Sequence, residues 1–251
     1  MIVVPQIIRI SIEITRMKEK QSIVIYGGGG GAVEIARYIR DQNESDVGHV
    51  CGEITDVIDD GAGRYSDLCS IVGREIKVHT SIDAVNDLIH KQFVVTLGNS
   101  PVRHQIYLAL KEKGVALYTV VHPTAQISEK AKVGDGSIIS PFVLLGAYSS
   151  IGENCFVNVR VTVGHDVMLG DSCILSPHVA VSGAVVAGAG VYCGAGAVIN
   201  PGLSIGQFCK LSSGAVVAKE VKGGSLVYGN PARSVKMFNP LTGNSLFAPT
   251  G

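Results

Sequence analysis

Tryptophan is absent from this sequence of 251 residues, aromatic residues make up only 6% of it, and neither sign of charge is in excess. The 21 Lys and Arg residues balance 21 Asp and Glu residues without forming a basic cluster, which argues against nucleic acid as a partner. No run of about 18 apolar residues occurs, so we expect no membrane-spanning segment. The N-terminal residues lack the charged start, apolar core and cleavage site of a secretory signal, so we expect a cytoplasmic protein.

The six cysteines form neither a CxxC pair nor a Cys/His spacing typical of a zinc site, and we expect no metal. Four of them occupy apolar positions of the repeat described next and should be buried and reduced: Cys155, Cys173, Cys193 and Cys209. Cys155 and Cys173 should be neighbours in space. A disulfide between them is conceivable but not expected in a cytoplasmic protein.

What the sequence does contain is an aliphatic residue at almost every sixth position from Val121 to Val217. Of these 17 positions, 15 are Val, Ile or Leu, and a glycine follows the aliphatic residue in eight hexads. The fifth position of each hexad is equally constrained, and only Leu203 is large there. A short repeat kept in register over about a hundred residues is typical of a β-solenoid.

Each hexad should form one short strand and one corner, with the aliphatic residue pointing inward and Gly or polar residues at the bends. Three hexads then close a triangular coil of eighteen residues, so that residues eighteen apart stack at about 4.8 Å. The repeat makes nearly six coils, a prism roughly 27 Å long. This fold also accounts for the 31 glycines and the positive mean hydropathy of a sequence poor in aromatic residues.

Ahead of the repeat, short apolar strands alternate with helices, which predicts a small parallel sheet with crossover helices. We expect strands at 22–26, near 47–51, near 76–79 and at 93–97, and helices at about 32–40, near 82–90 and at about 103–113. The predicted units are an N-terminal extension (1–20), a Rossmann-like α/β domain (21–118), the solenoid (119–222) and an irregular C-terminal tail (223–251). The extension is either an additional strand or sequence upstream of a start at Met17. The tail should pack over the open end of the solenoid, and the two domains should pack tightly because no linker separates them.

Five glycines follow the first predicted strand and fit the pattern G-x-G-x-x-A of a phosphate-binding turn. Glycines let the backbone approach a phosphate and direct the amides of a helix N-terminus toward it. Glu53 lies about twenty positions further on, where such sites carry an acidic residue. The candidate nucleotide-binding residues are Gly27, Gly29, Gly30, Gly31 and Glu53. A merely structural tight turn is the alternative.

His165 is the strongest candidate for catalysis. It occupies the third position of its hexad, which the repeat directs outward near a corner, and Asp166 follows it as an orienting carboxylate. Imidazole is a natural base for taking a proton from an amine or hydroxyl at neutral pH. A solvated surface histidine is the alternative. His122 and His178 could line one face with it, but their spacing does not suggest a zinc site.

The late coils, from Ala187 to Ala197, consist almost entirely of Gly, Ala and Val. Small residues would let a long, thin ligand lie against exposed backbone amides, and basic residues that follow could meet phosphates at its end. Coenzyme A fits this description, and the candidate residues are Gly183, Gly194, Ala195, Gly196, Lys210, Lys219 and Arg233. Tight packing and solubility are the alternative explanation.

The hexads, together with the segment Gly-Asn-Pro-Ala-Arg at 229–233, resemble the left-handed β-helix (hexapeptide-repeat) acyltransferases. The glycine loop, the segment Leu-Gly-Asn at 97–99 with Arg103, and the segment 121–128 resemble sugar acetyltransferases of bacterial surface-glycan biosynthesis such as lipopolysaccharide. These are the nucleotide-linked 4-amino-sugar N-acetyltransferases and the sialic acid O-acetyltransferase type. The resemblance covers about residues 22–236, and the left hand of the helix comes from it.

The resemblance implies a homotrimer with acetyl-CoA between neighbouring solenoids and a sugar nucleotide held by the α/β domain. The family's catalytic base, a His followed by an acidic residue, falls on His165 and Asp166, and an Asn seven residues earlier falls on Asn158. The implied reaction is direct attack of the acceptor on the thioester, with a backbone amide stabilising the oxyanion. N-acetylation is the first choice and O-acetylation the second. A γ-type carbonic anhydrase and a non-catalytic scaffold are the alternatives from other classes.

Three positions depart from the family's pattern. Gly31 stands where a His is common, Cys-Gly-Glu at 51–53 stands where aspartates follow the second strand, and Ile174 stands where a second His is often found. These positions concern acceptor and cofactor binding. They leave the nucleotide and the acyl group open.

Overall fold

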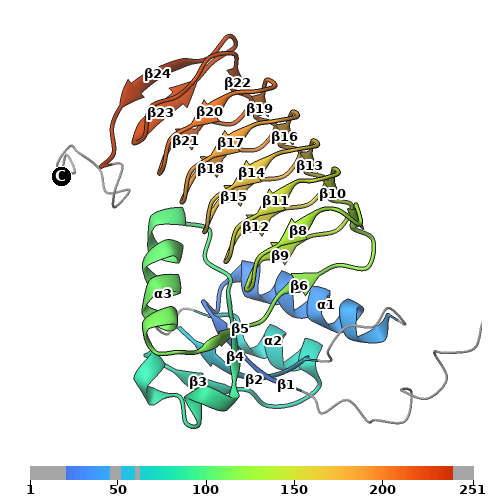
Figure 1. The fold of residues 1–251 in the computed structure, drawn as a ribbon. Coiled ribbons are helices and arrows are strands. Elements are labelled where there is room, and N and C mark those ends of the chain that lie inside the picture. The colour runs from blue at the N-terminus through green and yellow to red at the C-terminus, as the bar shows by residue number, and fades with distance from the viewer. Residues whose placement is uncertain (1–20, 46–51, 60–62, 240–251) are drawn as a thin grey trace, which may run out of the picture.

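The computed structural model describes residues 21–45, 52–59 and 63–239, and in it a triangular solenoid stands on a small α/β domain (Figure 1). The expectation for residues 1–20 lies outside the described residues. The α/β domain comprises β1 (Gln21–Tyr26), α1 (Gly30–Glu44), β2 (Gly52–Ile58), α2 (Tyr65–Val72), β3 (Lys77–His79), the 3₁₀ turns η1 (Ile82–Ala84) and η2 (Leu88–His90), β4 (Gln92–Val95), α3 (Ser100–Glu112) and β5 (Ala116–Leu117). Its five strands are all parallel in the order β3-β2-β1-β4-β5, which confirms the predicted parallel sheet.

One prediction in this domain is wrong, one falls outside the described residues, and one helix was missed. The strand predicted near 47–51 lies outside the described residues, and β2 begins at Gly52, where a Cβ would come within 2.2 Å of the Ile23 side chain. Asn43 also pairs with both the N–H and the C=O of Gly52, which holds the first residue of this strand in place. The helix predicted near 82–90 is two short turns, because Asp87 adopts a left-handed conformation (φ 58°) between them. The helix α2 was not predicted.

The solenoid is built from strands of two residues that recur every six residues, as the period predicts. They are β6 (Val120–Val121), β7 (Gln126–Ile127), β8 (Lys132–Val133), β9 (Ile138–Ile139), β10 (Leu144–Leu145), β11 (Ser150–Ile151), β12 (Phe156–Val157), β13 (Thr162–Val163), β14 (Met168–Leu169), β15 (Ile174–Leu175), β16 (Ala180–Val181), β17 (Val186–Ala187), β18 (Tyr192–Cys193), β19 (Val198–Ile199), β20 (Ser204–Ile205), β21 (Lys210–Leu211) and β22 (Val216–Val217).

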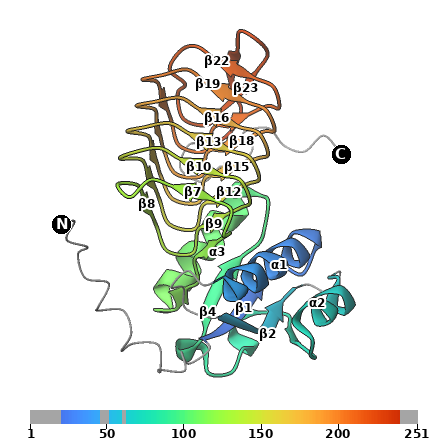
Figure 2. The ribbon, with the colours of Figure 1, turned by 90° about the vertical axis from the view of Figure 1, so that its right-hand side faces the viewer.

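Every third strand belongs to the same parallel sheet, so the prism has three faces (Figure 2). Face 1 runs from β6 to β21, face 2 from β7 to β22 and face 3 from β8 to β20. We name the corners by the faces they join, as corner 1–2, corner 2–3 and corner 3–1. Partner residues such as Leu145 and Val163 are eighteen apart, which confirms the predicted coil.

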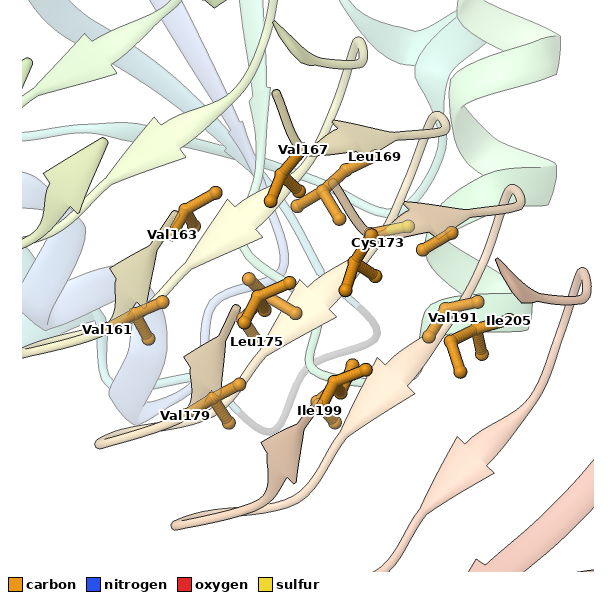
Figure 3. Close-up of a cluster of buried hydrophobic side chains, with 14 of the residues drawn as sticks. Val161, Val163, Val167, Leu169, Cys173, Leu175, Val179, Val191, Ile199 and Ile205 are labelled. Atoms are coloured by element: carbon orange, nitrogen blue, oxygen red, sulfur yellow. The ribbon is translucent and has the colours of Figure 1, made fainter. Parts of the chain in front are cut away.

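The interior of the prism is a column of aliphatic and small side chains (Figure 3). The four cysteines assigned to inward positions are buried free thiols, as predicted. Burial raises the pKa of the Cys193 thiol to about 12, so this sulfur is inert filler and no nucleophile.

The corners follow a rule that the sequence did not reveal. The fourth position of the hexad is left-handed in all fourteen hexads from Gly136 to Gly214, and nine of these residues are not glycine, for example Phe142 (φ 59°) and Asp166 (φ 57°). The glycines of the second position serve a different purpose. A Cβ on Gly170 would lie 2.6 Å from the backbone nitrogen of Ala189 in the next coil, so glycine is needed there for close stacking.

The C-terminal segment is more regular than expected. The strand β23 (Ser225–Tyr228) pairs in parallel with β21, and β24 (Arg233–Lys236) pairs with it antiparallel, which extends face 1. The prediction of an irregular tail is therefore wrong for these residues. It rested on the end of the hexad, but backbone pairing continues after the side-chain period stops. Residues 240–251 lie outside the described part.

The α/β domain covers the part of face 1 from β6 to β18. Outward side chains of that face, such as Phe156 and Ile174, share one buried cluster with Ile35 and Ile39 of α1. The helix α3 runs along corner 3–1 (Figure 1), where Ser100 donates to the Gly190 carbonyl at 3.0 Å. The predicted tight contact between the domains is confirmed.

Candidate active site

His165 lies on corner 2–3, directly after β13, with its side chain 70% exposed. Its Nδ1 is 2.8 Å from a carboxylate oxygen of Asp166, whose left-handed backbone turns that side chain alongside the ring. A carboxylate only accepts, so Nδ1 carries the proton and Nε2 keeps its lone pair. The pair has the geometry of a general base with its orienting group.

Gly183 lies one coil further along the same corner and supports the ring. A Cβ at this position would come within 2.7 Å of both Cε1 and Nε2 of His165, so the imidazole lies against the Gly183 backbone. In the described part of the chain the Gly183 amide has no hydrogen-bond partner. The free nitrogen of the base therefore has an unused N–H donor beside it.

The remaining predicted coenzyme A residues fall into three groups. Lys219 lies on corner 2–3 three coils beyond His165, about 14 Å away at the inter-strand spacing. The small residues Gly194, Ala195 and Gly196 lie on corner 1–2, and Lys210 and Arg233 lie on face 1. Within one chain the three groups therefore divide between two corners and one face.

Asn158 is also separated from His165 within the chain. It precedes β13 on corner 1–2, whereas His165 follows β13 on corner 2–3. Its side-chain oxygen accepts from the Val159 amide at 2.7 Å. The two residues thus lie at opposite ends of one strand of face 2.

The glycine loop follows β1 and is held from two sides. Gly27 has φ 104° and its carbonyl accepts from the Thr96 hydroxyl at 2.9 Å, while the Gly28 amide donates to Asp59 at 3.0 Å. No atom lies within 4 Å of where a Cβ of Gly29 or Gly30 would be, so the start of α1 opens onto free space. The order of the strands reverses between β1 and β4, and such a crevice is the usual ligand site of an open α/β sheet.

Glu53 does not belong to this loop, contrary to the prediction. It pairs with Ser22 at the beginning of β1 and forms an ion pair with Arg74 at 3.1 Å, at the other end of the sheet. The acidic residue that follows β2 is Asp59, which also accepts from the Tyr65 hydroxyl at 2.6 Å. The error about Glu53 arose because the second strand was expected before Gly52. Since Asp59 follows β2, the aspartate of the family's pattern is present, and 51–53 is no departure from that pattern.

Sequence reasoning also missed a cavity of about 330 Å³ between the loop after β4 and face 1. It is lined by Gly98, Asn99, Ser100, Pro101, Tyr192, Phe208, Cys209, Lys210 and Phe238. Tyr192 and Lys210 are neighbours at outward positions of face 1. An aromatic or charged residue at such a position was the one feature of the sequence that could have indicated this cavity.

Among the described residues, no three His, Cys, Asp or Glu side chains gather as a possible metal site. No helix in that part of the chain is long and apolar enough to cross a membrane.

No protein-family model matches the sequence. The chain is 35% identical over 153 residues to the GDP-perosamine N-acetyltransferase of Escherichia coli O157:H7, across 59% of this chain and 69% of that protein. PerB from Caulobacter crescentus, solved in complex with CoA and GDP-perosamine, has a TM-score of 0.73 at 26% identity, with 85% and 97% of the two chains covered. WeeI from Acinetobacter baumannii AYE has a TM-score of 0.72 at 29% identity, with 86% and 100% covered.

Proposed function

Because the chain belongs to the hexapeptide-repeat, left-handed β-helix family of acetyl-CoA-dependent sugar acetyltransferases, we propose that it acetylates the amine of a GDP-linked amino sugar of the perosamine type. The observation that carries this proposal is the pair of His165 and Asp166, held against Gly183 on an open corner. The acetylated sugar would serve surface-polysaccharide synthesis.

His165 acts as the general base. Its Nε2 takes a proton from the acceptor amine while the nitrogen attacks the thioester carbonyl carbon. The carbon–nitrogen bond forms, the carbon–sulfur bond breaks, and the proton passes from His165 to the departing CoA thiolate. Asp166 stabilises the imidazolium during the step, and the unpaired Gly183 amide donates to the oxyanion. No cysteine takes part.

We further infer that three copies of the chain form a ring with face 2 toward the axis. The outward residues of face 2 carry no charge: Gln126, Leu144, Thr162, Ala180, Val198 and Val216. Phe142 and Tyr148, on the two corners that flank this face, are 59% and 64% exposed. Exposed apolar surface of this kind marks an interface.

A ring explains why the predicted residues divide between two corners. In a closed cyclic assembly, one patch of each copy meets a different patch of the next. Corner 1–2 of one copy therefore meets corner 2–3 of its neighbour. This brings Asn158 and Gly194 of one copy to His165 and Lys219 of the next, with acetyl-CoA in the groove between them.

The test is turnover measured by mass spectrometry, with acetyl-CoA and a panel of GDP-, UDP- and dTDP-linked amino sugars. We expect an N-acetylated product with the GDP-linked sugar. The His165→Asn variant should lose roughly a hundredfold or more in turnover while its thermal midpoint stays unchanged, because the side chain is exposed. An O-acetylated product would replace the proposed reaction by sugar O-acetylation. If His165→Asn turned over at the wild-type rate, His165 would not be the general base.

A further inference from the structure

We propose that Lys210 and the aromatic cavity beside it bind the diphosphate of the acceptor nucleotide, so that the solenoid itself supplies part of the acceptor site. This inference rests on the proposed function, and it moves Lys210 from coenzyme A to the acceptor. The ligand class is a nucleoside diphosphate.

The cavity has the size and construction of a ligand site. Its volume of about 330 Å³ lies at the lower end of small-molecule pockets, which hold about 300–1,000 Å³. One wall is the loop Gly98–Pro101 of the α/β domain, and the other is face 1 with Tyr192 and Lys210. Phe238, beyond the last strand, lines a further side.

The walls are fixed before any ligand arrives. Phe208 is buried with a left-handed backbone (φ 51°), and its ring packs edge-on against His104 with centroids 5.4 Å apart. A Cβ on Gly190 would come within 2.2 Å of the Phe208 ring, so glycine at that position makes room for it. The Lys210 Nζ lies 5.7 Å from the centre of the Tyr192 ring. A preformed site avoids the cost of ordering side chains on binding.

The charge of the cavity suits an anion. No Asp or Glu side chain lines it, and Lys210 forms no ion pair with any of the described residues. A second cavity, of about 390 Å³, offers a contrast, because Lys111 there is paired with Glu153 at 3.0 Å and Asp135 also lines it. That pairing raises the pKa of Lys111, so its ammonium stays charged, and the carboxylate of Glu153 offsets this charge. Of the two lysines, Lys210 is the one available to a phosphate.

No residue of the glycine loop lines the cavity, but the two are neighbours through Leu97 and Gly98. A Cβ on Gly27 would come within 2.8 Å of the Leu97 side chain, so the loops after β1 and β4 touch, and Gly98 follows immediately. A nucleotide held at the start of α1 can therefore extend its diphosphate toward Lys210. Lys219, by contrast, lies on corner 2–3 in line with His165. The two lysines serve different substrates.

The experiment compares Lys210→Met with Lys219→Met in the full chain. Calorimetry with GDP, which needs no turnover, should show that Lys210→Met binds GDP about tenfold more weakly and that Lys219→Met binds it like the wild type. The KM values should divide in the same way. Lys210→Met raises the KM of the acceptor about tenfold and leaves the KM of acetyl-CoA within twofold, whereas Lys219→Met does the reverse. Lys210→Arg, which keeps the charge, should restore GDP binding to within about threefold.

Three results would overturn the proposal: wild-type GDP binding in Lys210→Met, a raised KM for acetyl-CoA in that variant, or no binding of GDP or UDP by the wild type. Failure of the proposed function looks different. In that case the wild type would acetylate no sugar in the panel, yet calorimetry would still report whether Lys210 holds a nucleoside diphosphate.

Discussion

The two halves of this chain are stabilised in different ways. In the solenoid each contact is made again eighteen residues later, as Leu145 meets Val163 and Val163 meets Val181. In the α/β domain and at its junction with the solenoid, the important contacts occur once. A repeated contact spreads stability over many equivalent positions. The outward third positions of the corners, such as that of His165, take no part in the core and are left for chemistry. A unique contact concentrates stability in one residue.

Arg103 is the clearest unique contact. It is fully buried, and its guanidinium donates to the carbonyls of Val95 in the sheet and of Asn154 and Cys155 in the solenoid. Burial lowers its pKa to about 10, so it remains a cation at neutral pH. One side chain thus joins the end of β4, next to the glycine loop, to the second coil.

The largest effect is expected from Arg103→Met. Three buried carbonyls would lose a donor, and only that of Cys155 is known to keep another, the Ile138 amide. At about 1–3 kcal/mol for each carbonyl left without a donor, the free energy of unfolding should fall by about 4 kcal/mol. Denaturation with urea measures this. Arg103→Lys should recover only part of the loss, because an ammonium cannot reproduce the planar fork. Lys111→Met, which removes an exposed ion pair of the same helix, is the control and should change stability little. Equal losses in Arg103→Met and Lys111→Met would contradict the comparison.

Asp56 provides the second test of a unique contact. It is buried and accepts from Lys91, from Thr55 at 2.5 Å and from His79 at 2.8 Å. Burial raises its pKa, but the hydrogen bonds outweigh this and lower the pKa overall. A carboxylate with a lowered folded-state pKa stabilises above its unfolded pKa of about 4, and this contribution is lost as pH falls through the folded value.

Asp56→Asn should therefore cost about 3 kcal/mol at pH 7, and its deficit relative to the wild type should shrink as pH falls below about 4. Denaturation curves between pH 7 and pH 3 measure both quantities. A deficit that stays constant over this range would mean that the charge of Asp56 contributes nothing.

A substitution at a repeated position of the solenoid should have a smaller effect on stability. Gly170→Ala places a Cβ against the backbone of the next coil, and the resulting strain should cost about 2 kcal/mol. Gly214→Ala is the matched control, since its site is left-handed (φ 69°) but has nothing within 4 Å. Non-glycine residues fill that slot in other coils, so Gly214→Ala should cost no more than about 1 kcal/mol. Thermal unfolding of both variants would show whether stacking or backbone conformation selects glycine, and the reverse order would contradict the stacking argument.

The smallest effect on stability is expected from Gly183→Ala, which instead tests the corner as a place for chemistry. The three atoms nearest to the added methyl group all belong to the exposed ring of His165, which can swing away, so the melting temperature should hardly move. Turnover should fall roughly tenfold, because the displaced imidazole no longer lies beside the Gly183 amide. Normal turnover in this variant would show that Gly183 does not position the base.

The sequence alone predicted most of the solenoid and little of what lies beside it. A six-residue period specifies which side chains point inward, and that rule also placed His165 and Asp166 on an outward corner. The boundaries of β2 and the break at Asp87 depend on single contacts and on a left-handed aspartate, which carry no periodic signal. The Lys210 cavity exists only because α3 packs along corner 3–1, and no local pattern shows which distant segments meet.

The third-position residues on corner 2–3 form a column in which each residue lies one coil beyond the last: His165, Gly183, Pro201 and Lys219. Each coil adds about 4.8 Å, so the column sets distances along the solenoid in fixed steps. The number of coils between His165 and Lys219 fixes how long a molecule must be for its reactive end to reach one while its charged end reaches the other. A relative with one more coil in this interval would fit a molecule about 4.8 Å longer, with the inward side chains of the existing coils unchanged.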